Sequence, residues 1–135
     1  IIRTDSLLIL DDCYNANPVS MKSSIDVLAS SKGRKVAILG DMFELGEEEK
    51  QLHYGVGEYF KDKNIDVLIT VGELSKNIAA GVRTVSVCDV YSYDTKDELE
   101  KDFSKLLKKG DNILVKASHG MQFTKIVDFL EKLEL

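Results

Sequence analysis

Residues 35–46 read KVAILGDMFELG, a short apolar run followed by a loop of glycine, acidic and apolar residues. The run itself, Lys35 to Leu39, is apolar after its first residue, which is typical of a strand covered on both faces. Four other runs are similarly short and rich in Val, Ile and Leu, and we predict strands there as well: Leu7 to Leu10, Val67 to Val71, Thr84 to Cys88 and Asn112 to Lys116.

Amphipathic stretches lie between these runs, and they predict helices. Their ranges are Val19 to Ser30, Glu47 to Lys63, Leu74 to Ala80, Lys96 to Lys108 and Met121 to Leu133. Alternation of short apolar runs with helices is the pattern of parallel strands joined by crossover helices. The sequence therefore predicts an α/β, Rossmann-like fold with a mainly parallel open sheet and helices on both faces. A length of 135 residues fits one domain, residues 1–135.

Composition excludes several classes of protein. A formal net charge of -5 gives no attractive field for a polyanion, so we expect no nucleic-acid partner. No run approaches the roughly 18 apolar residues of a spanning helix, so we expect no membrane insertion. Cys13 and Cys88 have no CxxC spacing, which suits reduced thiols and a cytoplasmic protein. The first residues lack the form of a signal peptide and resemble the middle of a longer chain.

Three polar clusters each follow a predicted strand and precede a predicted helix. They read DDCYNANP at 11–18, GDMFELG at 40–46 and KASHG at 116–120. Because parallel strands end at the same edge of a sheet, the clusters should converge there, where open α/β sheets bind ligands. Each cluster alone could simply turn the chain and cap a helix. Three together favour a binding site.

The side chains of these clusters suit a nucleotide. Asn and Asp can hydrogen-bond the edge of a base and the diol of a ribose, and Tyr14 could pack on a ring. Lys116 can counter the charge of a phosphate, and Ser118 can hydrogen-bond an oxyanion at the start of the next helix.

Other conspicuous residues favour structural roles. His53 falls within a predicted helix, and Glu47 to Glu49 suit a helix start, where negative charge opposes the helix dipole. No GxxxxGK[ST] or GxGxxG motif occurs, and neither does His/Cys spacing typical of metal ligands, so we expect no metal site. The chain therefore carries no phosphate-binding loop of its own.

In this order, the clusters resemble the C-terminal domain of the Mur ligases, in the branch that joins a dipeptide to a peptidoglycan precursor. The D-S-Y-N-A-N-P-x-S-M pattern of that family matches residues 12–21, with Cys13 in place of Ser. L-G-D-M-x-E-L-G matches residues 39–46. V-K-G-S-R-G-M resembles residues 115–121, with Ala117 for Gly and His119 for Arg.

The resemblance implies an ATP-dependent reaction of a UDP-N-acetylmuramoyl-tripeptide with D-alanyl-D-alanine. A substrate carboxylate becomes an acyl phosphate, which the amine of the dipeptide attacks to form an amide. In such enzymes a central domain supplies the phosphate-binding loop for ATP and most of the Mg²⁺ ligands, and this third domain closes over the cleft. The partners of the chain would be the N-terminal and central domains of the same polypeptide, and the isolated domain would be inactive.

Site roles carried over from the family fall into three groups. The expected nucleotide-binding residues are Asp12, Tyr14, Asn15 and Asn17. The expected catalytic residues, facing the transferred phosphate or the dipeptide, are Lys116, Ser118 and His119. The expected substrate-binding residues are Asp41 and Glu44.

Two alternatives remain open from the sequence. His119 replaces an arginine that would stay charged and grip an anion with two hydrogen bonds, so the chain could belong to a divergent ligase with another amino-acid acceptor. A receiver-like or other ligand-binding module without catalysis would share the fold. However, a receiver needs an Asp at the end of its third strand, and the sequence there is TVGE, residues 70–73.

Overall fold

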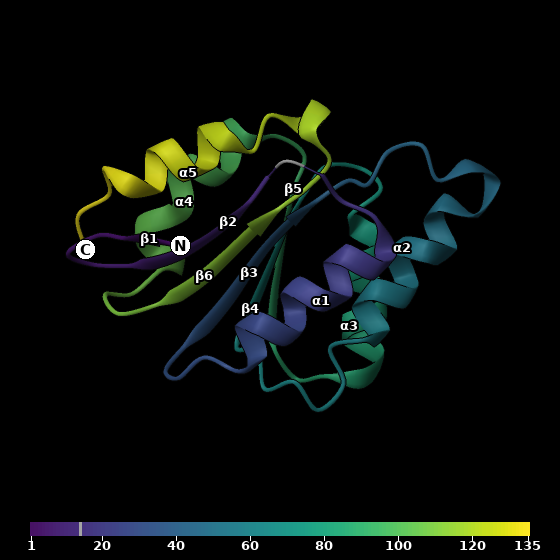
Figure 1. Ribbon diagram of the computed structural model, residues 1–135, viewed down its shortest axis with the longest axis horizontal. Coiled ribbons are helices and arrows are strands. Elements are labelled where there is room, and N and C mark those ends of the chain that lie inside the picture. Colours follow the sequence, from purple (N-terminus) through teal and green to yellow (C-terminus); the bar gives the residue numbers. More distant parts are fainter. Residues whose placement is uncertain (14) are drawn as a thin grey trace.

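A six-stranded sheet forms the centre of the chain, in the order β1-β2-β6-β3-β4-β5 (Figure 1). The computed structural model describes residues 1–13 and 15–135. The strands are β1 (Ile2–Arg3), β2 (Leu8–Asp12), β3 (Lys35–Gly40), β4 (Val67–Val71), β5 (Asp89–Tyr93) and β6 (Asn112–Lys116). All neighbouring strands pair in parallel except β1, which runs antiparallel to β2 at the edge. The predicted α/β fold with a mainly parallel sheet is confirmed.

Helices cover both faces of this sheet, as predicted. They are α1 (Pro18–Ala29), α2 (Glu49–Glu58), α3 (Lys76–Val85), α4 (Lys96–Leu106) and α5 (Thr124–Glu131), with short 3-10 turns η1 (Gly46–Glu48) and η2 (His119–Met121). Figure 1 shows α1, α2 and α3 on one face and α4 and α5 on the other. Each face has its own apolar core: Ile25, Phe60 and Val82 belong to the first, and Phe103 and Ile126 to the second.

One predicted strand was wrong. Residues 84–88 do not form a strand, because α3 continues to Val85 and the edge strand β5 begins at Asp89. Val82 faces the core from α3, whereas Val87 is fully exposed in the connection. An apolar run of this length cannot by itself distinguish the end of an amphipathic helix from a strand. The real strand was overlooked because an edge strand has polar and partly exposed residues.

Helices α2 and α3 touch through glycines. A Cβ atom on Gly57 would lie 2.1 Å from the carbonyl oxygen of Ile78, and one on Gly81 would lie 2.2 Å from that of Tyr54. The two backbones can approach this closely only because neither glycine has a side chain. This contact fixes the position of α3, whose first turn abuts the site described below.

Candidate functional site at the carboxyl edge of the sheet

The three polar clusters meet at one edge of the sheet. Strands β2, β6 and β3 are neighbours, and Lys116 at the end of β6 is in register with Asp12 on one side and Leu39 on the other. Strand β6 is last in sequence but central in space, so it brings the third cluster between the first two. The predicted convergence is therefore confirmed.

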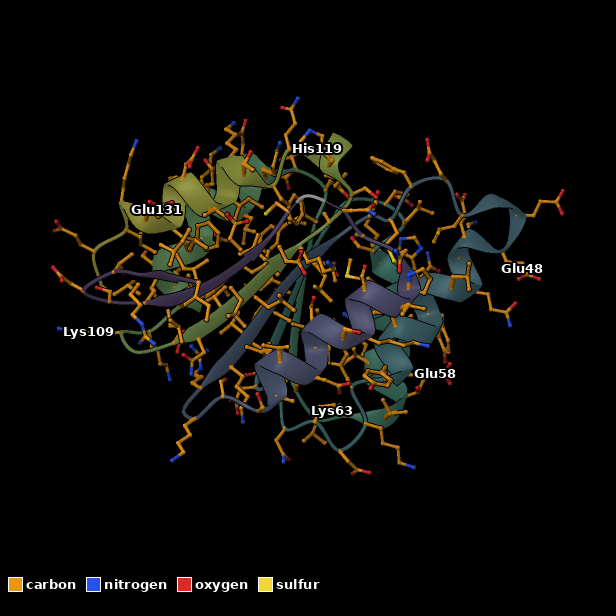
Figure 2. All side chains as sticks on the ribbon, viewed as in Figure 1. Glu48, Glu58, Lys63, Lys109, His119 and Glu131 are labelled. Carbon is orange, nitrogen blue, oxygen red and sulfur yellow. The ribbon has the colours of Figure 1, made fainter. Side chains whose placement is uncertain are left out.

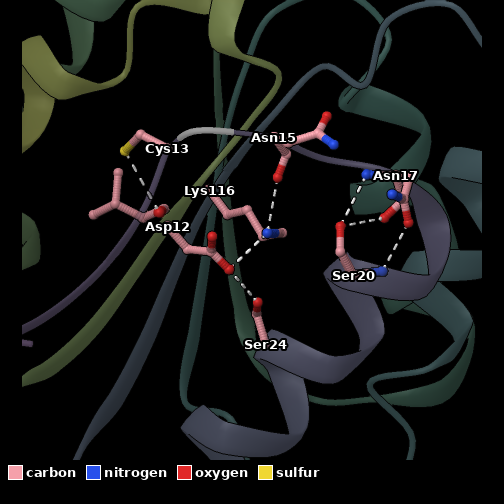
Figure 3. A network of polar contacts seen from close by, with 8 residues as sticks. Asp12, Cys13, Asn15, Asn17, Ser20, Ser24 and Lys116 are labelled. Atoms are coloured by element: carbon pink, nitrogen blue, oxygen red, sulfur yellow. Dashed lines mark hydrogen bonds and ion pairs between the residues drawn. The ribbon is translucent and has the colours of Figure 1, made fainter.

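Lys116 is the buried centre of this edge. Its side chain is 2% exposed, and its ammonium group donates to Asp12 Oδ2 at 2.6 Å and to the carbonyl oxygen of Asn15 at 3.0 Å (Figure 3). The lysine thus joins the end of β6 to the loop that follows β2. In this arrangement its charge is directed at Asp12 and not at open solvent.

Asp12 lies partly in solvent, with 45% of its side chain exposed. Its Oδ2 accepts a second hydrogen bond from the Ser24 hydroxyl, at 2.7 Å. Burial by itself would raise the pKa of Asp12, but the hydrogen bonds from Lys116 and Ser24, with the charge of the lysine, outweigh burial and lower the pKa below its usual value. The carboxylate is therefore ionised at neutral pH and partly accessible.

The remaining residues of the first cluster shape the start of α1. Asn17 is the N-cap: its side-chain oxygen accepts from the Ser20 backbone N–H at 2.9 Å, while the Ser20 hydroxyl accepts from the Asn17 backbone N–H at 3.0 Å. This reciprocal capping box gives Asn17 a structural role, and its expected contact with the nucleotide stays a prediction. The Asn15 side chain is exposed at the edge. Tyr14, predicted to pack on a nucleotide ring, lies outside the described residues.

A second set of hydrogen bonds joins the other two clusters. The Ser118 backbone N–H donates to the carbonyl oxygen of Asp41 at 3.0 Å, and the Ser118 hydroxyl accepts from the backbone N–H of Phe43 at 2.8 Å. Both Ser118 and Asp41 are buried. The hydroxyl predicted to meet an oxyanion thus supports the loop after β3 in this structure.

Asp41 points toward the start of α3. Its Oδ1 accepts from the backbone N–H of Ser75 at 2.7 Å. A Cβ atom on Gly72 would lie 2.5 Å from the same oxygen, so the carboxylate occupies space that only glycine leaves open. This geometry supports a structural role for Asp41, and its expected contact with substrate stays a prediction.

Glu44 and His119 are exposed members of the predicted site, in the second and third clusters. Glu44 has a left-handed backbone, with φ of 62°, at the tip of the loop after β3. His119 begins the turn η2. Figure 2 shows it at the same edge, whereas Lys63 and Lys109 lie near the opposite ends of the strands. These two side chains are placed where a partner domain or a ligand could reach them.

His53 has a structural role that the sequence had favoured. It is fully buried, and its Nε2 accepts from the backbone N–H of Met42 at 2.9 Å. Since Nε2 accepts, the proton belongs on Nδ1, which lies 2.6 Å from the carbonyl oxygen of Glu49. The histidine therefore ties the loop after β3 to α2.

In residues 1–13 and 15–135, no group of three His, Cys, Asp or Glu side chains is arranged to hold a metal ion. The longest described helix, α1, has 12 residues. No helix in the described part of the chain is both long and apolar enough to cross a membrane.

Two hollows differ in their relation to this edge. The larger, about 800 Å³, lies at the opposite end of the strands, where Arg34, Asp66 and Arg83 contribute to its lining. The smaller, about 200 Å³, lies beside Asp12 and is lined in part by Leu10. We place the site at the carboxyl edge, where the three polar loops converge, and the second hollow touches that edge at Asp11 and Asp12.

Sequence reasoning overlooked Ser24 and Gly72. Ser24 lies on the buried face of α1 together with Met21, Ile25 and Leu28. A hydroxyl within an otherwise apolar helical stripe needs a hydrogen-bond partner, and this signal could have revealed it. Gly72 could not have been found in the same way, because its partner is distant in sequence.

Comparison with known proteins identifies the family. The family model described as "Mur ligase, glutamate ligase domain" matches residues 1–119, most of the chain. The chain belongs to the Mur ligase family. This membership disfavours the receiver-like alternative, which shares the general fold but lacks the family's pattern of loops.

Relatives of this Mur ligase domain carry a consistent name. The UDP-N-acetylmuramoyl-tripeptide--D-alanyl-D-alanine ligase of Bacillus subtilis (strain 168) is 40% identical over 97% of the chain, and its namesake in Buchnera aphidicola subsp. Baizongia pistaciae (strain Bp) is 36% identical over 92%. The chain spans 30% of the first protein and 26% of the second. It therefore corresponds to less than a third of each relative.

Solved structures agree with these relatives. The MurF ligase from Thermotoga maritima in complex with ADP superimposes with a TM-score of 0.80 at 30% identity, covering 97% of this chain and 29% of that one. A MurF structure from Acinetobacter baumannii gives a TM-score of 0.82 at 28% identity, covering 98% of this chain and 30% of that one.

Proposed function

We propose that the chain is the C-terminal domain of a three-domain, ATP-dependent ligase that adds D-alanyl-D-alanine to a UDP-N-acetylmuramoyl-tripeptide. The observation that carries this proposal is the 40% identity to the Bacillus subtilis ligase across nearly the whole chain. The convergence of three loops at one sheet edge supplies a surface on which a nucleotide and a second domain can meet.

The proposed reaction passes through an acyl phosphate. ATP phosphorylates the tripeptide carboxylate, the amine of the dipeptide attacks the carbonyl carbon, and phosphate leaves as the amide forms. Mg²⁺ would supply positive charge to the phosphates, and most of its ligands would come from outside this domain. The three loops would close over the intermediate, since an acyl phosphate must be kept from water and the amine must be held beside it.

Within this domain, the exposed face of Asp12 is placed to contact the ribose or base, with Asn15 beside it. Glu44 and His119 are exposed at the same edge and could reach the peptide substrate. Lys116 holds Asp12 and the loop carbonyl of Asn15, so its geometry supports a positioning role. Direct contact with the transferred phosphate would require Lys116 to exchange partners on closure.

The cellular location belongs to the same proposal. Cys13 and Cys88 form no disulfide, and burial raises the pKa of both thiols. Unpaired, inert cysteines are usual in the reducing cytoplasm. We therefore place the reaction in the cytoplasm.

The test of the function uses the full-length ligase that contains this chain. ADP release and product mass are measured with ATP, Mg²⁺ and UDP-N-acetylmuramoyl-tripeptide, adding either D-alanyl-D-alanine or a single amino acid. We expect product only with the dipeptide. Preference for a single amino acid would instead show that the enzyme is a divergent ligase with another acceptor, the alternative suggested by His119 in place of the family arginine.

The role of Lys116 can be tested in the same enzyme. If Lys116 positions the nucleotide site, Lys116→Ala should raise the KM for ATP. If it touches the phosphate only in the closed state, the substitution should lower kcat with little change in KM. Asn17→Ala removes a helix cap and should lower the melting temperature by a comparable amount in the presence and absence of ATP.

A further inference from the structure

Ser24 makes an unusual contact for a residue in the middle of a helix. Serine hydroxyls in and near helices commonly bond to the local backbone, as those of Ser30 and Ser31 do just after the end of α1. The Ser24 hydroxyl instead donates to Asp12 Oδ2, twelve residues earlier, at 2.7 Å. Ser24 is almost entirely buried, so the bond is shielded from water.

The two oxygens of Asp12 are used differently. Oδ2 accepts from both Ser24 and Lys116, at 2.7 Å and 2.6 Å. Figure 3 shows both contacts converging on that oxygen, and within the described residues Oδ1 has no hydrogen-bond partner. Since the side chain is 45% exposed, Oδ1 remains available to a ligand at the sheet edge.

We propose that Ser24 is a positioning residue for nucleotide binding: it fixes the Asp12 carboxylate through Oδ2 and so presents Oδ1 to a ribose hydroxyl. This inference rests on the proposed function in naming the ligand class. Lys116 alone could hold Oδ2 while the carboxylate plane rotates about that contact. A second donor from α1, on the other side, removes this freedom.

The chemistry suits a neutral hydroxyl donor. An ionised carboxylate accepts hydrogen bonds strongly, and a ribose hydroxyl is a donor that Oδ1 can meet while Oδ2 is held by Ser24 and Lys116. Holding the carboxylate before the ligand arrives reduces the ordering cost of binding. Loss of one fixing hydrogen bond should weaken nucleotide affinity by about three- to tenfold.

The test compares Ser24→Ala with two other variants. Ser24→Thr keeps the hydroxyl, and Ser23→Ala is the matched control, because Ser23 is the exposed neighbour on the same helix and has no partner among the described residues. Alanine favours helix, so these variants are expected to fold, which circular dichroism checks. The carboxyl carbon of Asp12 is titrated by NMR in this chain, and ADP affinity is measured by calorimetry in the full-length ligase.

We expect the pKa of Asp12 to rise in Ser24→Ala, with weaker ADP binding, while Ser24→Thr and Ser23→Ala resemble the wild type. An Asp12 titration unchanged by Ser24→Ala would overturn the proposal. A changed titration with unaltered ADP affinity would overturn the nucleotide-positioning role. Absence of ADP binding by the wild-type ligase would count against the proposed function instead, and the NMR titration would still decide whether Ser24 controls Asp12.

Discussion

Removing either partner of the Asp12–Lys116 ion pair should have unequal effects on stability. The pair joins a carboxylate that is 45% exposed to a lysine side chain that is 2% exposed. Lys116→Met deletes the buried charge and fills its place with an apolar chain of similar length. Asp12→Ala deletes the exposed partner and leaves the buried ammonium with the Asn15 carbonyl oxygen.

The magnitudes follow from burial. Lys116→Met removes two hydrogen bonds, to Asp12 and to the carbonyl oxygen of Asn15, but it also removes a buried charge. Asp12 keeps its bond to Ser24 and reaches water, so we expect a net cost of about 1 kcal/mol. After Asp12→Ala, a buried charge loses its counter-ion, which costs about 3–5 kcal/mol in fully buried sites. Water can enter the space left by the carboxylate and partly solvate the ammonium group, so we expect a cost near the lower end of this range, about 3 kcal/mol. The two variants should differ by about 2 kcal/mol.

Urea unfolding of the chain, followed by circular dichroism, measures this difference. With a slope of about 2 kcal/mol per molar urea, the midpoint of Asp12→Ala should lie about 1 M below that of Lys116→Met. Lys63→Met is the control, because the Lys63–Asp26 ion pair is exposed and its loss should move the midpoint little. Equal costs for the two Asp12–Lys116 variants, or a larger cost for Lys116→Met, would refute the reasoning from burial.

The pH dependence gives the same pair a second signature. The pKa of Asp12 is lowered in the folded chain relative to about 3.9 in an unfolded one. Its contribution to stability is therefore present above about pH 4 and is lost as the pH falls through the lower, folded-state pKa. Lys116→Met should flatten the acid side of the stability profile, and an unchanged acid limb would contradict this account.

Three other outcomes follow from the packing. Gly57→Ala should destabilise the chain by about 2 kcal/mol or more, because the new methyl group would meet the Ile78 carbonyl oxygen. Gly55→Ala in the same helix adds a methyl group that meets no atom, and it should stabilise the chain by about 0.5–1 kcal/mol. Urea midpoints of the two variants test this pair. His53→Ala should cost about 2–4 kcal/mol, since it removes a buried ring that bonds two backbone groups. A free energy of unfolding within about 0.5 kcal/mol of the wild-type value, roughly the scatter of surface substitutions, would argue against that role. Cys13 should react with iodoacetamide much more slowly than a free thiol at pH 7, because burial raises its pKa, and mass spectrometry of the alkylated chain would detect a contrary result.

Much of the fold was accessible from the sequence because parallel strands leave a simple pattern. The range predicted for β4, Val67 to Val71, matches the structure, as does the range for β6, Asn112 to Lys116. Both strands are buried on both faces and contain few polar residues. Strand β5 failed for the opposite reason: it lies at the edge, and Asp89 and Ser92 are exposed.

The convergence of the site was also predictable, but the contacts within it were not. The rule that parallel strands share a carboxyl edge brings Asp12, Asp41 and Lys116 together without knowledge of strand order. Which side chains point outward depends on that order. Only after β6 is placed between β2 and β3 does Lys116 reach Asp12, and only after α3 is packed on α2 does Asp41 meet Ser75.

These internal bonds change what the site can be expected to do. Lys116, Ser118 and Asp41 are buried and bonded to neighbouring loops, whereas Asp12, Glu44 and His119 retain exposed surface. A binding edge whose charged groups are held by each other needs little reordering when a ligand arrives, and the ordering cost is met during folding. The residues predicted to form the site are therefore of two kinds, with different consequences when replaced. Substitution of the buried kind should change stability and ligand affinity together, and so should substitution of Asp12, because it is the counter-ion of the buried Lys116. Substitution of Glu44 or His119 should change affinity or turnover alone.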